Sequence, residues 1–167
     1  AHKSEVSGLS ISPDDRYLAT FGFEGMWRVW DLASGGQVFE VSGHVPPNFA
    51  GGARGPATRI SAHLLEKQYF SRDGRRVALS TGPGEVSVFE VPSGRVICVA
   101  KNQRGWSYRN LFCAGGQTLL CTPYQESFVT LFNANTGAVV AELKGHGGQV
   151  IHTNVSPDGA LILTTSV

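Results

Sequence analysis

The sequence has few cysteines, little net charge and no long hydrophobic run. Its three cysteines, Cys98, Cys113 and Cys121, lack the CxxC spacing of zinc sites and are odd in number, so we expect free thiols in a reducing compartment. The net charge of +1 gives no general attraction for nucleic acid or an anionic membrane. The first residues contain no apolar signal-peptide core. We therefore expect a cytoplasmic protein, with the nucleus as the alternative, that has no membrane partner and is a poor candidate for nucleic acid.

Motifs of common catalytic sites are also missing. The sequence contains no GxSxG, HExxH, Walker or dinucleotide-binding pattern, and the glycine-rich segment at 51–56 does not lead from a strand into a helix. His2, His44 and His146 recur at one position of a repeat, whereas His63 and His152 show no metal-ligand spacing. We therefore expect no enzymatic activity, no metal and no cofactor.

Turn-forming residues are plentiful instead. The 167 residues include 21 glycines and 8 prolines, and 41% of the chain is hydrophobic, which favours short strands around a core over disorder. Four segments, which start at Leu9, Gln68, Leu111 and Thr153, each place a tight polar turn between two alternating apolar stretches. This pattern predicts four β-hairpins.

The hairpins recur at a regular distance. With Ser12, Ser71, Ala114 and Ser156 as turn anchors, the separations are 59, 43 and 42 residues. The last two match the roughly 40 to 45 residues of one four-stranded propeller blade.

A second strand–turn–strand segment follows each of the first three hairpins, at 26–44, 85–102 and 127–146. Alternation makes Val29, Val88 and Leu131 equivalent, and their neighbours Trp30, Phe89 and Phe132 place a bulky aromatic at one fixed position. We expect these aromatics to support sheet-on-sheet packing between neighbouring units.

These residues closely resemble the WD40 repeat family. The resemblance rests on the Gly-His pairs at 43–44 and 145–146, the SPDD and SPDG turns at 12–15 and 156–159, and the Trp-Asp pair at 30–31. It implies an all-β fold, a β-propeller with about 3.5 four-stranded blades present. The units expected are about 1–44, 45–101, 102–146 and 147–167.

An arc of this kind leaves apolar faces uncovered at its two ends. We expect the chain to be part of a longer protein whose remaining blades complete a closed ring. The alternative is self-association, in which two such chains close one ring between them.

The resemblance also implies a structural hydrogen-bonded group that joins the Trp of the Trp-Asp pair to a His, a Ser or Thr, and an Asp. In the first unit His2, Trp30 and Glu24 fill three places, but Gly22 occupies the hydroxyl position, so we expect an incomplete network. His146 and Ser166 are the expected first half of such a group in the fourth unit.

The other two units have lost the indole donor, so apolar packing is expected to carry more of their stability. The residues at these positions are Thr81, Pro83 and Phe89 in the second unit, and Glu126, Tyr124 and Phe132 in the third. For Arg28 we expect an ion pair at a sheet edge or between blades, and we assign no role to Arg75 and Arg76.

Two connections are candidate partner-binding loops. The connection at 43–63 is about 16 residues longer than its equivalents and contains Arg54 and Arg59, but a solvated insertion is an equal alternative. The connection at 101–110 is rich in arginine and aromatic residues, the types enriched at interface hot spots, although Trp106 is also suited to filling a blade interface. Its candidate contact residues are Lys101, Arg104, Trp106, Tyr108 and Arg109.

The favoured function is a non-catalytic scaffold that mediates protein–protein interactions within a multiprotein assembly. The alternative is the substrate-recruiting or sensor propeller of a larger enzyme or signalling protein. A third and weaker hypothesis is recognition of RNA or phosphopeptides by the 101–110 loop, because arginine and aromatic side chains also stack on bases and grip phosphates.

Overall fold

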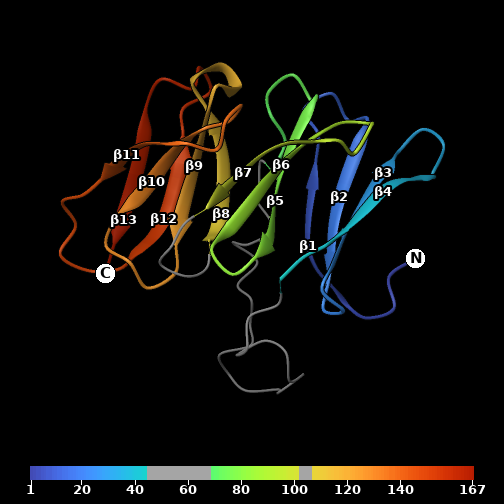
Figure 1. Cartoon of the computed structure of the whole chain (residues 1–167), viewed down its shortest axis with the longest axis horizontal. Coiled ribbons are helices and arrows are strands. Elements are labelled where there is room, and N and C mark those ends of the chain that lie inside the picture. Colours follow the sequence, from blue (N-terminus) through green and yellow to red (C-terminus); the bar gives the residue numbers. More distant parts are fainter. Residues whose placement is uncertain (45–68, 102–106) are drawn as a thin grey trace.

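A computed structural model of the protein describes residues 1–44, 69–101 and 107–167, apart from the Tyr108 side chain. The chain forms short strands joined by turns (Figure 1). In chain order they are β1 (Val6–Ile11), β2 (Tyr17–Gly22), β3 (Met26–Asp31), β4 (Gln37–Ser42), β5 (Arg76–Gly82), β6 (Glu85–Glu90), β7 (Val96–Lys101), β8 (Ser107–Cys113), the 3₁₀ turn η3 (Ala114–Gly116), β9 (Thr118–Pro123), β10 (Val129–Asn133), β11 (Val139–Leu143), β12 (Val150–Val155) and β13 (Ile162–Ser166). Within these ranges, no helix is long and apolar enough to cross a membrane.

The strands form four antiparallel sheets that follow one another along the chain (Figure 1). In chain order, the first sheet contains β1–β4, the second contains β5–β7 and the third contains β8–β11. Strands β12 and β13 pair in the fourth sheet. A bridge from Phe70 to Val77 occupies the inner position beside β5. The predicted all-β fold with four-stranded antiparallel sheets is therefore confirmed, while the residue boundaries between repeat units remain predictions.

The third hairpin is one residue out of step with the prediction. In the other hairpins the amide of Ser12, Ser71 or Ser156 donates to the carbonyl oxygen five residues later, at 2.8 to 2.9 Å. In the third hairpin Cys113, and not Ala114, pairs with the residue five positions on, Thr118. The reason is local, because Ala114, Gly115 and Gly116 all have positive φ and wind into η3. With Cys113 as the third turn anchor, the separation from Ser71 is 42 residues and the separation to Ser156 is 43 residues.

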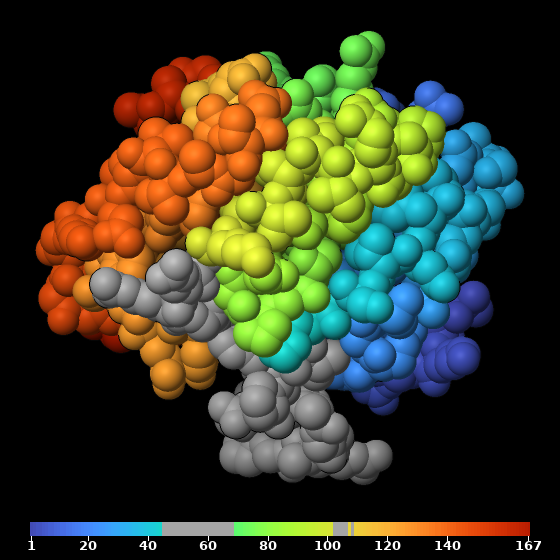
Figure 2. All heavy atoms as spheres, viewed as in Figure 1, coloured from blue at the N-terminus to red at the C-terminus, as the bar shows by residue number. Residues whose placement is uncertain are grey.

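Apolar side chains fill the space between consecutive sheets. Alternation along β5 sends Val77 and Leu79 toward the first sheet and Ala78 toward the third, so both faces of the middle sheets are buried. Leu120, Val129 and Val150 make the corresponding contact between the third sheet and β12–β13. Figure 2 shows the successive sheets in contact, from the blue N-terminal sheet through green and yellow to orange.

Aromatic residues dominate the contact between the first two sheets. The Trp27 ring lies 4.6 Å from the Phe21 ring and 5.2 Å from the Tyr69 ring, and its indole N–H donates to the Ser80 carbonyl oxygen at 3.0 Å. Phe89 packs against Phe39 of β4, and Phe132 lies in the next core, as predicted for this repeat position.

The hydrogen-bonded group of the first unit is complete, which corrects the sequence-based interpretation. Trp30 Nε1 donates to Thr20 Oγ1 at 2.8 Å, and Thr20 Oγ1 lies 2.7 Å from His2 Nε2. His2 Nδ1 lies 2.6 Å from Glu24 Oε1. The hydroxyl comes from Thr20, diagonal to Trp30 across β2 and β3, because Trp30 is directly opposite Leu18.

Gly22 has another role in this group. A side chain at Gly22 would collide with the Glu24 carboxylate and the His2 ring, so glycine leaves room for the network.

The predicted hydroxyl position was two residues too late in the second and fourth units as well. His146 Nε2 lies 2.7 Å from Thr164 Oγ1, not Ser166, and repeats the 18-residue separation of His2 and Thr20. In the second unit the register places Leu79, not Thr81, at the hydroxyl position.

Arg28 ties this network to the outer strand of the same sheet. It is only 6% exposed, donates through Nε to Glu40 Oε2 at 3.1 Å, and contacts the Glu24 carboxylate through Nη1. The expected ion pair is present: Arg28 lies on the inner strand β3, and its directly opposite partner Glu40 lies on β4, the edge strand of the sheet. Burial raises the pKa of the Glu24 carboxyl, but hydrogen bonds from Ser4, Arg28 and His2 outweigh it and hold that pKa well below its usual range.

Replacing Thr20 by valine removes the shared hydroxyl while preserving the side-chain shape. We expect Thr20→Val to lower the free energy of unfolding by about 1 to 3 kcal/mol, because Trp30 and His2 each lose a partly buried hydrogen-bond partner. Urea unfolding of the variant against wild type measures this change. Thr165→Val, at an exposed position, is the matched control and should have little effect. Equal stability of Thr20→Val and wild type would show that the network contributes nothing.

The charge of Glu24 predicts a pH dependence of stability. Because its folded-state pKa is lowered, the carboxylate stabilises the fold above its unfolded pKa of about 4.3, and this contribution is lost as the pH falls through the folded-state value. Glu24→Gln should therefore be less stable than wild type at neutral pH, with a gap that narrows below about pH 4. Urea unfolding at several pH values tests this, and a gap that does not change with pH would contradict it.

Candidate functional site

The structure describes only part of the predicted partner-binding set. Arg54, Arg59, Arg104 and Trp106 lie outside the described residues, so their role remains a prediction. Lys101 ends β7, is exposed, and pairs with Glu85 of the same sheet, with Nζ 2.9 Å from Oε1. Such an exposed pair contributes little to stability, which leaves Lys101 available for a partner.

Arg109 and Tyr108 lie on β8, the inner strand of the third sheet. Arg109 is half-buried, donates to the Thr153 carbonyl oxygen at 3.2 Å, and lies 3.2 Å from His152 Nδ1 through its other terminal nitrogen. Its Nε is buried and has no hydrogen-bond partner among the described residues. Arg109 thus connects β8 to β12, a structural contact that the sequence did not predict, whereas Lys101 contacts its own sheet.

The opposite ends of the inner strands carry the tight hairpin turns. In three of them a serine hydroxyl donates to an aspartate two residues later, as in the 2.6 Å bond from Ser71 to Asp73. The same aspartate accepts a backbone N–H two residues further on, for example that of Arg75 at 3.1 Å. These bonds form compact Asx-type turns and fix the shape of each hairpin end.

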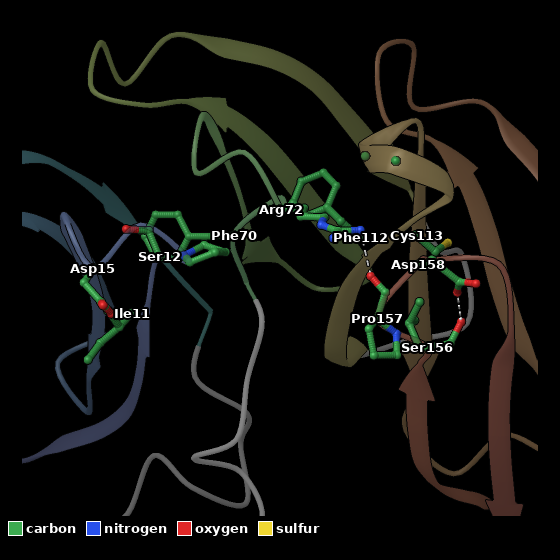
Figure 3. A pocket seen from close by; sticks show the side chains of 15 residues that line it. Ile11, Ser12, Asp15, Phe70, Arg72, Phe112, Cys113, Ser156, Pro157 and Asp158 are labelled. Carbon is green, nitrogen blue, oxygen red and sulfur yellow. Dashed lines mark hydrogen bonds between the residues drawn. The ribbon is translucent and has the colours of Figure 1, made fainter.

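The four hairpin ends surround one shared depression of about 540 Å³ (Figure 3). Each repeat unit contributes to its lining, and the side chains mix apolar, acidic and basic character. Arg72 reaches across from the second unit and donates to the Pro157 carbonyl oxygen of the fourth at 2.9 Å. The Ala114 amide donates to the Gly159 carbonyl oxygen at 3.0 Å. Other lining residues include Ile11, Ser12, Asp15, Phe70, Phe112, Cys113, Val155, Ser156 and Asp158.

The chemistry of this depression suits binding. The hydrogen bond from Ser156 lowers the pKa of Asp158, so its carboxylate is a fixed negative charge at neutral pH. Burial raises the pKa of the Cys113 thiol, which keeps it protonated and a poor nucleophile. Across the described ranges, no three His, Cys, Asp or Glu side chains lie close enough together to hold a metal ion.

Sequence reasoning missed this depression because it treated the hairpins only as turn signals. The available signal was the recurrence of Ser-x-Asp at Ser12, Ser71 and Ser156, always after an inner strand. Equivalent turns on neighbouring sheets must lie side by side, and so they enclose a common surface.

Comparison with known proteins supports the repeat assignment. Residues 1–31 match the family model described as WD domain, G-beta repeat. This segment contains β1 to β3 and the complete hydrogen-bonded group.

Several longer proteins are similar to almost the whole chain. It is 25% identical to "Apoptotic protease-activating factor 1" of Danio rerio, over 99% of this chain and 12% of that protein. It is 27% identical to "Anaphase-promoting complex subunit cdc20" of Dictyostelium discoideum, over 99% of this chain and 31% of that protein. It is 28% identical to "Protein FIZZY-RELATED 3" of Arabidopsis thaliana, over 98% of this chain and 31% of that protein. The chain thus spans less than a third of each of these relatives. The match over residues 1–31 confirms the predicted resemblance to WD40-repeat proteins, and the recurring four-stranded sheets agree with it.

Proposed function

We propose that this chain is a non-catalytic WD40 scaffold that mediates protein–protein interactions within a multiprotein assembly. The observation that supports this most directly is the stack of sheets joined by three apolar cores, with stiff turns from every unit around one depression. A rigid stack holds surface groups in fixed relative positions, which lowers the ordering cost of binding. The proposed contact residues are Arg54, Arg59, Lys101, Arg104, Trp106, Tyr108 and Arg109.

A second candidate is the substrate-recruiting or sensor propeller of a larger enzyme or signalling protein. The names of the similar proteins favour it, since one is a protease-activating factor and another a subunit of a complex, and the chain matches only a fraction of each. The sequence of the full-length protein distinguishes the two candidates by the presence or absence of a catalytic or signalling domain.

Exposed apolar residues support further propeller blades as partners. Leu9 and Ile11 on β1 are 40% and 50% exposed, and Leu161 and Leu163 beside and within β13 are 70% and 64% exposed. We propose that blades of the same longer protein, or of a second copy, cover these side chains.

Two minor proposals follow from the sequence. The three cysteines are buried and free, which is compatible with the proposed cytoplasmic or nuclear location. Recognition of RNA or phosphopeptides through the 101–110 loop remains the weaker alternative, and steep salt dependence of binding would favour it.

The scaffold proposal is tested by replacing Lys101, Arg104 and Trp106 together by alanine in the full-length tagged protein. We expect at least one protein captured by wild type to bind about tenfold or more weakly, because such residues are typical hot spots. Quantitative affinity purification measures the captured proteins, and thermal unfolding measures stability.

Lys144→Ala is the matched control. Lys144 is also exposed and pairs with a glutamate of its own sheet, with Nζ 2.7 Å from Glu142 Oε2. Unchanged capture by the triple variant would contradict the proposed contact residues. A matching fall in melting temperature would assign them to the folded core instead.

A further inference from the structure

Positive charge gathers at one place on the hairpin ends of the second sheet. A groove of about 580 Å³ lies between the turn before β5 and the turn between β6 and β7. Arg75, Arg76 and Arg95 line it, and Arg72 precedes them in the same turn as Arg75. Four of the chain's 14 Lys and Arg residues are therefore in these two turns and the start of β5.

The first and third sheets carry only one of these arginines at equivalent positions. Backbone hydrogen bonds make Arg16, Arg75 and Gln117 equivalent, because their carbonyl oxygens accept from Leu32, Val91 and Ala134 respectively. By the same criterion Arg95 is equivalent to Gly36 of the first sheet and Ala138 of the third. Strand register makes Arg76 equivalent to Tyr17 and Thr118. The repeat fold does not require arginine at these positions, and among the first three sheets only the second has all three arginines together.

The two carboxylates beside the groove already have local partners. Asp73 accepts hydrogen bonds from the Ser71 hydroxyl at 2.6 Å and the Arg75 amide at 3.1 Å. Glu90 accepts two bonds from Arg95, each 3.2 Å long, and one from Ser93 at 2.7 Å. Burial raises the pKa of Asp73, but the Ser71 hydrogen bond and the nearby arginines lower it more, so this carboxylate stays ionised.

The arginines keep unused donor capacity. Arg75 is exposed, and its guanidinium donates no hydrogen bond to any described residue. Arg95 uses two of its five N–H donors on Glu90, and its side chain is 67% exposed. Arg76 donates one bond to Asn135 Oδ1 at 2.9 Å. Planar guanidinium groups with free N–H donors are suited to bidentate contacts with carboxylates.

We propose that this basic groove binds an acidic peptide segment of a partner protein. Val91, Pro92 and Ile97 supply apolar surface between the arginines, so the groove fits a peptide in which Asp or Glu side chains flank an apolar residue. The surface is distinct from the proposed contact residues near Lys101, because Lys101 is opposite Glu85 at the other end of the sheet from Arg76 and Glu90.

A peptide suits the groove better than nucleic acid does. Single-stranded RNA and DNA are usually held by aromatic side chains that stack on bases, and no aromatic residue lines this groove among the described residues. Nucleic-acid binding also relies on many phosphate contacts, whereas the arginines here are few and lie beside two carboxylates.

Selection from a library of random 12-residue peptides displayed on phage, with the full-length protein as bait, tests this inference. We expect the selected peptides to be enriched in Asp and Glu around an apolar residue. Their synthetic forms should bind about tenfold more weakly to Arg75→Glu than to wild type, and about tenfold more weakly when their acidic residues are replaced by Asn and Gln. Fluorescence anisotropy measures both ratios.

Arg16→Glu is the matched control, because Arg16 holds the equivalent position in the first sheet. Arg75→Lys, which keeps the charge, should retain most of the affinity, and equal melting temperatures of the variants exclude unfolding as the cause. Equal losses in Arg16→Glu and Arg75→Glu would overturn the proposal, as would selection without acidic enrichment. Binding of a 12-nucleotide single-stranded RNA more tightly than any selected peptide would also overturn it.

Discussion

The structure depends on the burial of apolar faces between consecutive sheets. The middle sheets have apolar side chains on both faces, and each face is removed from water by the neighbouring sheet that covers it. This requirement explains why alternation along β5 and β9 produces buried residues on both sides, with Leu79 facing one core and Ala78 the next. It also explains why the exposed apolar residues of β1 and β13 belong to the two ends of the stack.

Polar groups within this stack fix its geometry as well as contributing to its stability. Hydrogen bonds join Thr20 of β2 to Trp30 of β3 and to His2 near the N-terminus, so the network fixes the N-terminal residues against β2 and β3. Phe89 and Phe132 replace the tryptophan in the next two sheets and are buried in apolar cores. The same repeat position therefore uses a hydrogen bond in the first sheet and packing in the others.

The sequence predicted the fold well because hairpin turns and alternation are local signals. It predicted the polar network less well, since the hydroxyl position depends on strand register, which places Thr20 and not Gly22 diagonal to Trp30. The third turn was misplaced by one residue because the positive φ of Ala114 has no clear sequence signature. Neither the hairpin depression nor the basic groove was predicted, because each depends on turns that become neighbours only in three dimensions.

The bond from Arg72 to the Pro157 carbonyl joins two units that are not consecutive. It shows that the hairpin ends of the second and fourth units converge on the same depression, although the third unit separates them in the sequence. A molecule bound in this depression would compete with the Pro157 carbonyl oxygen for the Arg72 guanidinium.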